Sequence, residues 1–271
     1  MRIILLAILF LGHFSFANEQ KNSKKFLDQM VGKWDLTVSG HMVMGEQEPQ
    51  KMHIKQQTEA KFYFDESLIV EKYFLKGKSF NNEAFEAENL DFFLFDPKKN
   101  VLIALQASSI YGIHTQAYKI DSGSKITAII EKKARVKVGS YYEFLNKGAE
   151  RTGLYSLQND NHNLTMNMSW LGFKVNDFDN KIKIKKKAVE NPKLKIIKEK
   201  HHKWVLGGSM LYAEFKGDKK YLELIGEMIT KQEIRKYQFH SDGSVKTFKA
   251  EGTKDKIIWK KTNYIYPIPE L

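Results

Sequence analysis

Residues 30–36 read MVGKWDL, and the character of the sequence changes within this stretch. Ser23 to Val31, which overlap the start of this stretch, begin with a serine that suits a helix N-cap and have the apolar spacing of a short amphipathic helix. From Asp35 onward the sequence reads as a strand. Gly32 lies at the junction, where a glycine allows the chain to turn sharply. The stretch therefore predicts a short helix that leads directly into the first strand, and it raises the question of why Trp34 lies at this corner.

Short strand-like segments fill most of the remaining chain. They are rich in β-branched and aromatic residues and often alternate between apolar and polar positions. Turn-forming sequences separate several of them, including DPKKN at 96–100, DSGS at 121–124 and SDGS at 241–244. Such regular spacing, with almost no intervening helix, predicts a mostly β protein that forms an antiparallel barrel or sandwich. Clear examples of the segments are WDLTVSG, SLIVEKYFL, LDFFLF, VLIALQAS and NLTMNMSW.

The composition divides the chain into three parts after its N-terminus. Residues 18–172 hold the long series of strands and predict an N-terminal β-barrel unit. Residues 173–203 contain a dense lysine cluster and predict a linker or an exposed edge hairpin. Residues 204–271 predict a C-terminal β unit that either completes the barrel or repeats it, because segments of the two halves are weakly similar. If the C-terminal unit completes the barrel, the final KIIWKK strand closes against the WDLTV strand.

The first residues, 1–17, have the features of a cleaved signal peptide. Arg2 precedes an apolar run from Ile3 to Leu11, and small residues precede a cleavage point near Ala17 and Asn18. We therefore expect an exported protein that is located in the periplasm or secreted. The sequence has no cysteine, so we expect no lipid anchor of the lipoprotein kind and no disulfide, and the core alone must hold the fold.

The sequence is basic, with a formal net charge of +12 that comes mainly from lysine. A basic surface favours anionic partners, and a lysine-rich face around 181–203 offers a way to dock on anionic lipid or polymer of the cell envelope. Lysines spread over many strands are more typical of a solvated face or a protected sheet edge. Recognition of nucleic acid would concentrate arginine beside exposed aromatic residues, so we expect no nucleic-acid partner.

The start and the end of the sequence resemble the calycin group, which comprises the lipocalins and their bacterial relatives. At the start, the match is a short helix followed by Gly32-Lys33-Trp34 and a strand. At the end, GGSMLYAEF followed by SDGSVKTFKAEGTKDKIIWKK is similar to the closing strands of an uncharacterised family of bacterial lipocalin-like proteins. The resemblance implies a barrel whose open bottom is covered by the helix, with the Trp34 indole buried across the floor.

The resemblance also implies a partner for the tryptophan and a class of ligand. In lipocalins an arginine from a late strand packs on this tryptophan, and the candidates here are Arg135, Arg151 and Arg235. The family binds small apolar or amphiphilic molecules inside the barrel, and we expect the same here. The first alternative is the envelope protein described above. The second is an enzyme whose barrel holds a buried acid or histidine with a perturbed pKa, which a sequence does not reveal.

The candidate ligand-binding residues are polar or aromatic side chains of the predicted strands. In YGIHTQAY, alternation places His114 and Tyr118 on one face, which either lines the barrel or forms an outward polar stripe. A barrel-lining His114 could ligate haem, as in some calycin relatives. Trp170 and Trp204 are candidates for the wall of an apolar cavity. The sequence has neither the residue spacing of a metal site nor a nucleophile elbow, so we expect no metal and no catalytic residue.

Overall fold

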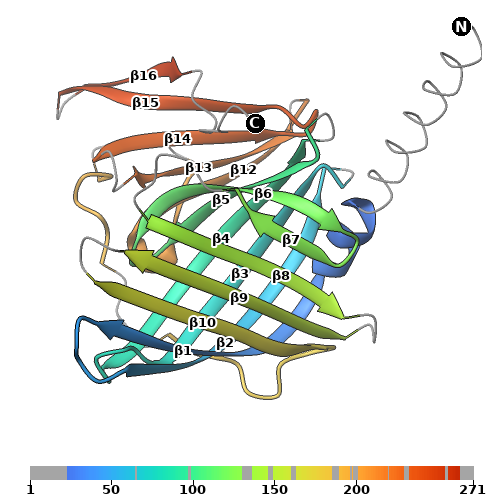
Figure 1. Cartoon of the computed structure of the whole chain (residues 1–271). Coiled ribbons are helices and arrows are strands. Elements are labelled where there is room, and N and C mark those ends of the chain that lie inside the picture. Colours follow the sequence, from blue (N-terminus) through green and yellow to red (C-terminus); the bar gives the residue numbers. More distant parts are fainter. Residues whose placement is uncertain are drawn as a thin grey trace, which may run out of the picture.

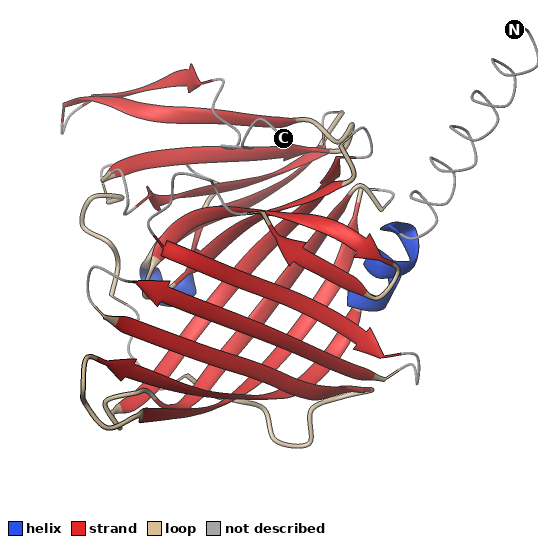
Figure 2. Cartoon of the chain, in the orientation of Figure 1, coloured by secondary structure: helices blue, strands red, loops and turns tan. Residues whose placement is uncertain are grey.

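The computed structural model confirms a mostly β protein with a short N-terminal helix (Figures 1 and 2). Its strands form a closed antiparallel barrel and a separate six-stranded sheet. The predicted signal peptide lies outside the described residues. The structure describes residues 23–64, 66–96, 99–129, 136–145, 149–159, 163–184, 189–195, 197, 201–218, 220–228, 232–253 and 256–262.

Ten strands form the barrel, each antiparallel to its neighbours. The first strand pairs with the second on one side and with the tenth on the other, which closes the barrel and leaves it without an edge. In a closed barrel, alternate residues of every strand point inward. The strands are β1 (Gly32–Met44), β2 (Gln50–Tyr63), β3 (Leu68–Lys78), β4 (Ala84–Asp96), β5 (Val101–Ser108), β6 (Gly112–Ser122), β7 (Lys125–Ala128), β8 (Val136–Leu145), β9 (Glu150–Asn159) and β10 (Leu164–Val175).

The strand that closes the barrel is not the C-terminal one. The alternative in which KIIWKK pairs with WDLTV is wrong, because β10 occupies that edge of β1 while β2 occupies the other. β1 therefore has no free hydrogen-bonding edge to offer a further strand. KIIWKK instead forms β16 (Lys256–Thr262), which pairs with β15 (Val245–Thr253) at the edge of the second sheet.

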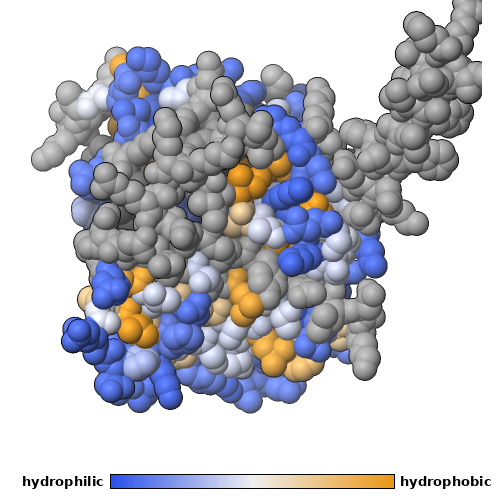
Figure 3. Space-filling model, viewed as in Figure 1, coloured by the Kyte–Doolittle hydropathy of each residue, from blue (hydrophilic) through white to orange (hydrophobic). Residues whose placement is uncertain are grey.

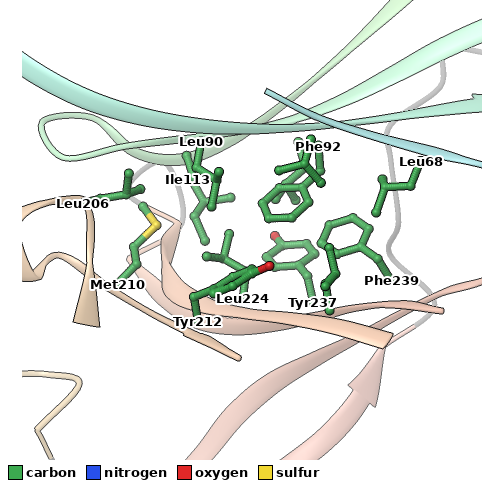
Figure 4. Packing of buried hydrophobic residues seen from close by; sticks show 14 of the residues in the cluster. Leu68, Leu90, Phe92, Ile113, Leu206, Met210, Tyr212, Leu224, Tyr237 and Phe239 are labelled. Carbon is green, nitrogen blue, oxygen red and sulfur yellow. The ribbon is translucent and has the colours of Figure 1, made fainter. Parts of the chain in front are cut away.

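The second sheet packs one of its faces on the outer wall of the barrel. Residues of β12, β13 and β14, such as Tyr212, Leu224 and Phe239, meet outward residues of β3 to β6, such as Phe92. The rings of Phe92 and Phe239 stack with their centroids 4.4 Å apart (Figure 4). We call this contact the seam. The sheet consists of β11 (Lys203–Val205), β12 (Met210–Lys216), β13 (Lys220–Met228), β14 (Glu233–His240), β15 and β16, with the 3-10 turn η2 (Leu206–Gly208) after β11.

The seam explains the sequence of β4. Its run LDFFLF lacks alternation, because Phe92 faces the seam while Phe93 faces the barrel interior. A strand that is buried on both faces reads as a continuous apolar run. Asp91 is the exception in this run, since it lies on the inward side with Phe93 and is 2% exposed. The outward side of β4 is thus packed in the seam, while its inward side places the buried acid Asp91 in the barrel.

The chain leaves the barrel along the outside of β2. Gln57 holds this crossing, since its Nε2 donates to the Asn180 carbonyl oxygen at 2.7 Å and its Oε1 accepts the N–H of Ile182 at 2.7 Å. Lys33 adds an ion pair with Asp177 at 2.8 Å. Within the described part of the lysine-rich segment, no strand lies between β10 and β11. This part of the segment follows the barrel wall as a strap.

The N-terminal helix, residues 23–30, covers one end of the barrel (Figure 2). Ser23, the predicted N-cap, lies within the helix, and its hydroxyl donates to Oδ1 of Asn100 at 2.9 Å. The side chain therefore ties the helix to the turn before β5. No helix among the described residues has the length and apolar character needed to cross a lipid bilayer.

Candidate ligand site inside the barrel

Trp34 fastens the helix to the end of the barrel. Phe26 and Met30 of the helix are fully buried in the same cluster as the indole. Gly32 has a φ of 133°, which residues with a side chain rarely adopt, and it turns the chain from the helix into β1. The Trp34 Nε1 donates to the Met30 carbonyl oxygen at 3.0 Å. This bond satisfies the buried indole and one of the carbonyl groups that a helix end leaves unpaired. The stretch MVGKWDL forms the floor of the barrel.

Arg151 of β9 lies beside this floor, inside the barrel. Its guanidinium carbon is 5.8 Å from the centroid of the Trp34 ring. Its Nη1 donates to Oε1 of Glu71 at 2.6 Å, and the two side chains are 2% and 3% exposed. Removing one partner of such a buried pair leaves a costly unpaired charge. Of the three predicted arginines, Arg151 makes the contact with the tryptophan, while Arg235 lies in the second sheet and Arg135 lies outside the described residues.

A second acid, Asp91, points into the same region from β4. It is the cross-strand partner of Glu71, which brings the two Cβ atoms to about 5 Å from each other. Burial raises the pKa of Asp91 well above its usual range, and the nearby Glu71 charge raises it further. Hydrogen bonds received from Gln106 and Tyr73 oppose this increase without cancelling it. The interior therefore favours the neutral form of Asp91 beside a charged arginine–glutamate pair.

Two polar atoms near this pair have no hydrogen-bond partner among the described residues. One is Oδ1 of Asp91, and the other is Nδ2 of Asn89, two positions earlier on the same inward face. Both residues are at least 96% buried, with exposures of 2% and 4%. A buried polar group without a partner is destabilising by about 1–3 kcal/mol. Asn89 and Asp91 therefore lower the stability of the barrel, so stability alone does not explain why polar residues occupy these positions.

These side chains form a polar belt across the middle of the barrel. Each member lies on the inward face of its strand and is buried or half-buried. The belt consists of Glu71, Asn89, Asp91, Gln106 and Arg151.

His114 and Tyr118 both face the interior. In the register of β5 and β6, His114 lies opposite Gln106 and Tyr118 lies opposite the core residue Leu102. The alternative of an outward polar stripe is therefore wrong. His114 remains exposed, although desolvation lowers its pKa, and a side chain that lines an enclosed but accessible space has both properties. Its neutral imidazole keeps one ring nitrogen as an acceptor, and haem ligation stays a prediction.

The end of the barrel away from the helix is lined by apolar side chains that are only partly buried. This contrasts with the floor, where the apolar side chains are buried almost completely. Methionine, which is flexible and polarizable, is common here and suits irregular apolar ligands. We call these inward residues the open-end lining: Met42, Met52, Phe85, Met166 and Met168. Apolar side chains that face a barrel interior and stay accessible are typical of a ligand site.

Trp204 does not share this interior. It belongs to β11 and packs with Leu211 and Ile225 on the face of the second sheet that points away from the barrel. The structure therefore brings His114, Tyr118 and Trp170 into one interior and separates Trp204 from them. Which aromatic residues come together depends on how the strands pair, and strands predicted one by one from the sequence do not reveal their pairing.

Two pockets among the described residues lie along the seam. The larger has a volume of about 200 Å³ and has Tyr63 and Tyr212 in its wall. The smaller measures about 150 Å³. At the larger pocket, Lys72 and Glu88 form an ion pair at 2.8 Å, and Lys61 and Glu59 form another at 3.0 Å. Both volumes are below the range of about 300–1,000 Å³ that small-molecule sites usually have. We therefore assign these pockets to the packing of the two layers.

The outer wall over β9 and β10 carries apolar side chains among polar ones (Figure 3). Leu154, Leu171 and Phe173 are 44%, 49% and 55% exposed. Leu171 is the chain neighbour of Trp170, but alternation directs the two side chains to opposite sides of the wall. The strand β10 thus offers inward and outward apolar positions that can be compared directly.

Glu71, Asn89 and Asp91 are not among the site residues that the sequence predicts. A signal was present, because Glu71 interrupts the apolar strand SLIVEKYFL and Asp91 precedes the apolar run FFLF. An acid in a strand that is buried on both faces needs a partner. The identity of that partner depends on how the barrel closes, since Arg151 lies 80 positions from Glu71 along the chain.

Comparisons with known proteins add little to this geometry. No protein family matches the sequence, and no curated protein matches it. Among solved structures, one similar chain is the S-type phycobiliprotein lyase CPES from Guillardia theta. The two chains are 11% identical, and the similarity covers 59% of this chain and 98% of the lyase chain, with a TM-score of 0.41. A likeness this distant assigns no function, so the site is interpreted from its own residues.

Proposed function

We propose that the protein binds a small amphiphilic molecule inside the barrel. The observation that carries the proposal is the change of character along the inward face. The floor is apolar and buried, the polar belt crosses the middle, and the open-end lining is apolar and accessible. An amphiphile matches this order, with its apolar part on the open-end lining and its polar group at the belt.

The expected energetics favour such a ligand. Covering accessible apolar surface contributes about 25 cal/mol for each Å² removed from water, and the half-buried methionines of the open-end lining offer that surface. The unpaired atoms of Asn89 and Asp91 would gain a partner from the polar group of the ligand. A bound amphiphile would therefore stabilise the barrel in two places: it would cover the open-end lining, and it would provide a hydrogen-bond partner for Asn89 and Asp91.

The test is a titration of the purified protein with N-phenyl-1-naphthylamine, a neutral apolar fluorophore. The variant Met168→Lys places a charge on the inward face of β10, while the matched variant Leu171→Lys places the same charge on the outward face. We expect Met168→Lys to weaken binding roughly tenfold, because burying an unpaired charge beside the fluorophore is unfavourable. Leu171→Lys should change binding by less than about twofold, since its charge stays in water.

Two results would contradict the proposal. One is a wild-type protein that does not bind the fluorophore at any accessible concentration. The other is a loss of binding in Leu171→Lys with none in Met168→Lys, which would place the fluorophore on the outer wall. Native mass spectrometry of the protein extracted from its source adds an independent readout, since a bound amphiphile should appear as a discrete added mass.

The alternative of docking on an anionic envelope surface has weaker support. Within the described part of the lysine-rich segment, Lys193 forms an ion pair with Glu227, and Lys195 lies 3.6 Å from Glu190. Lysines that are paired within the protein contribute less to an attractive surface. We further propose that the chain is exported, as residues 1–17 predict, and cell fractionation with detection of the mature N-terminus is the measurement for that step.

A further inference from the structure

Asn89 and Asp91 present two unpaired polar atoms on one inward face of β4. Alternate residues of a strand are roughly 7 Å apart at their Cα atoms, so both side chains can reach a single small group between them. The seam fixes this strand from behind, because the outward neighbours Leu90 and Phe92 are buried against the second sheet. The two atoms are thus held in place by packing that does not involve the barrel interior.

Both atoms are hydrogen-bond donors in the form that the interior favours. Nδ2 of Asn89 belongs to an amide NH₂ group, which only donates. Oδ2 of Asp91 accepts the N–H of Gln106 at 3.1 Å, while Oδ1 has no hydrogen-bond partner among the described residues, so we place the proton of a neutral Asp91 on Oδ1. Burial and the charge of Glu71 raise the pKa of Asp91 and favour this neutral form. Two donors that can reach one point call for an acceptor atom.

The charge balance of the belt restricts that acceptor further. Arg151 and Glu71 cancel each other as an ion pair at 2.6 Å, and a neutral Asp91 adds no charge. An anionic head group would bring an unpaired charge into this buried region and would compete with Glu71 for Arg151. A cationic head group would meet two donors and no free acceptor. An uncharged acceptor avoids both costs.

We propose that the polar group of the ligand is an uncharged carbonyl, as in a ketone or an ester, and that its oxygen accepts hydrogen bonds from Asn89 and Asp91. This inference rests on the proposed function, since it assigns the chemical class of the head group to the amphiphile in the barrel. The apolar chain of that molecule lies along the open-end lining.

The experiment displaces N-phenyl-1-naphthylamine from the wild-type protein at pH 7 with ten-carbon competitors that differ in their head group. The competitors are 2-decanone, methyl nonanoate, 1-decanol, decanoate and decylamine. We expect the ketone and the ester to bind roughly tenfold more tightly than decanoate and decylamine, because they accept hydrogen bonds from both donors and the ions must lose hydration. A preference for decanol over the ketone would overturn the inference, since it would show that Asp91 accepts a hydrogen bond.

The variants Asn89→Leu and Asp91→Leu each remove one donor with little change of shape. We expect each to reduce the preference for the ketone by roughly fivefold, and we expect Asp91→Asn to lose less because its amide can still donate. Asn167→Leu makes the same amide-to-leucine change on the outward face of β10 and serves as the control. Thermal melting shows which variants are folded.

The outcomes separate this inference from the proposed function. If the fluorophore does not bind the wild-type protein, the proposed function fails and the head-group assignment falls with it. If the fluorophore binds and all five competitors displace it equally, or the ions displace it best, the amphiphile site stands and the carbonyl assignment is wrong. This wild-type series does not depend on the folding of any variant.

Discussion

The two ends of the barrel interior are built from the same strands but differ in almost every property. At the helix end, Trp34, Phe26 and Met30 are buried almost completely and the indole is hydrogen-bonded to the helix. At the open end, Met166 and Met168 face inward and remain partly accessible. The difference teaches that the helix end contains most of the close packing, whereas the accessible apolar surface on which the proposed ligand would lie is at the open end. Substitutions at the floor should affect folding most, and substitutions at the open end should affect ligands most.

The two inward tryptophans give the largest expected contrast. Trp34→Ala removes a fully packed indole and its bond to Met30, so we expect the free energy of unfolding to fall by about 3–5 kcal/mol. Trp170→Ala should lower it by less than half as much, because that ring is only half-buried. Chemical denaturation followed by circular dichroism measures both changes. Equal losses would show that the depth of burial inside the barrel does not set the contribution of each indole to stability.

The second prediction concerns the buried ion pair between Arg151 and Glu71, which lies beside the floor of the barrel. Arg151→Leu leaves Glu71 as an unpaired buried acid, and we expect a loss of about 3 kcal/mol. Adding Glu71→Gln to this variant should recover part of the loss, because the unpaired charge is removed. The same denaturation measurement on the single and double variants gives the coupling between the two residues. A double variant that is no more stable than Arg151→Leu alone would contradict the role assigned to the pair.

The smallest expected effect is a dependence of stability on pH. Asp91 has a raised pKa in the folded protein, so above about pH 3.9 the folded state holds a proton that the unfolded chain has released. Its contribution to stability is therefore largest at low pH and declines as the pH rises towards the folded pKa. Asp91→Asn cannot titrate, so its stability should decline less than that of the wild type over this range.

The control for the pH experiment is Asp35→Asn, which changes an exposed acid on the outward face of β1. We expect its unfolding free energy to follow the wild-type curve when denaturation is repeated at several pH values. Parallel curves for the wild type and Asp91→Asn would show that Asp91 is ionised in the folded protein.

The sequence predicts the floor of the barrel well and the polar belt poorly, for a physical reason. Gly32 and Trp34 act locally, through a turn and a contact four residues away, so a short stretch contains most of the information. The Glu71–Arg151 pair and the separation of Trp204 from the barrel both depend on which distant strands pair. Alternation placed His114 and Tyr118 on one face, but only barrel closure decides that the face points inward.

Closure of the barrel also has a consequence for how the chain acquires its fold. β1 is the first strand of the barrel, but one of its two partners is β10. The ladder between them, in which Trp34 lies opposite Lys174, can therefore form only after β10 is in place. Contacts between such distant segments are slow to form, because the intervening chain must be ordered first. Until then β1 presents an unpaired edge to any other strand. A helix as short as residues 23–30 is marginal on its own in water, so we expect the cap to become stable only together with the closed barrel.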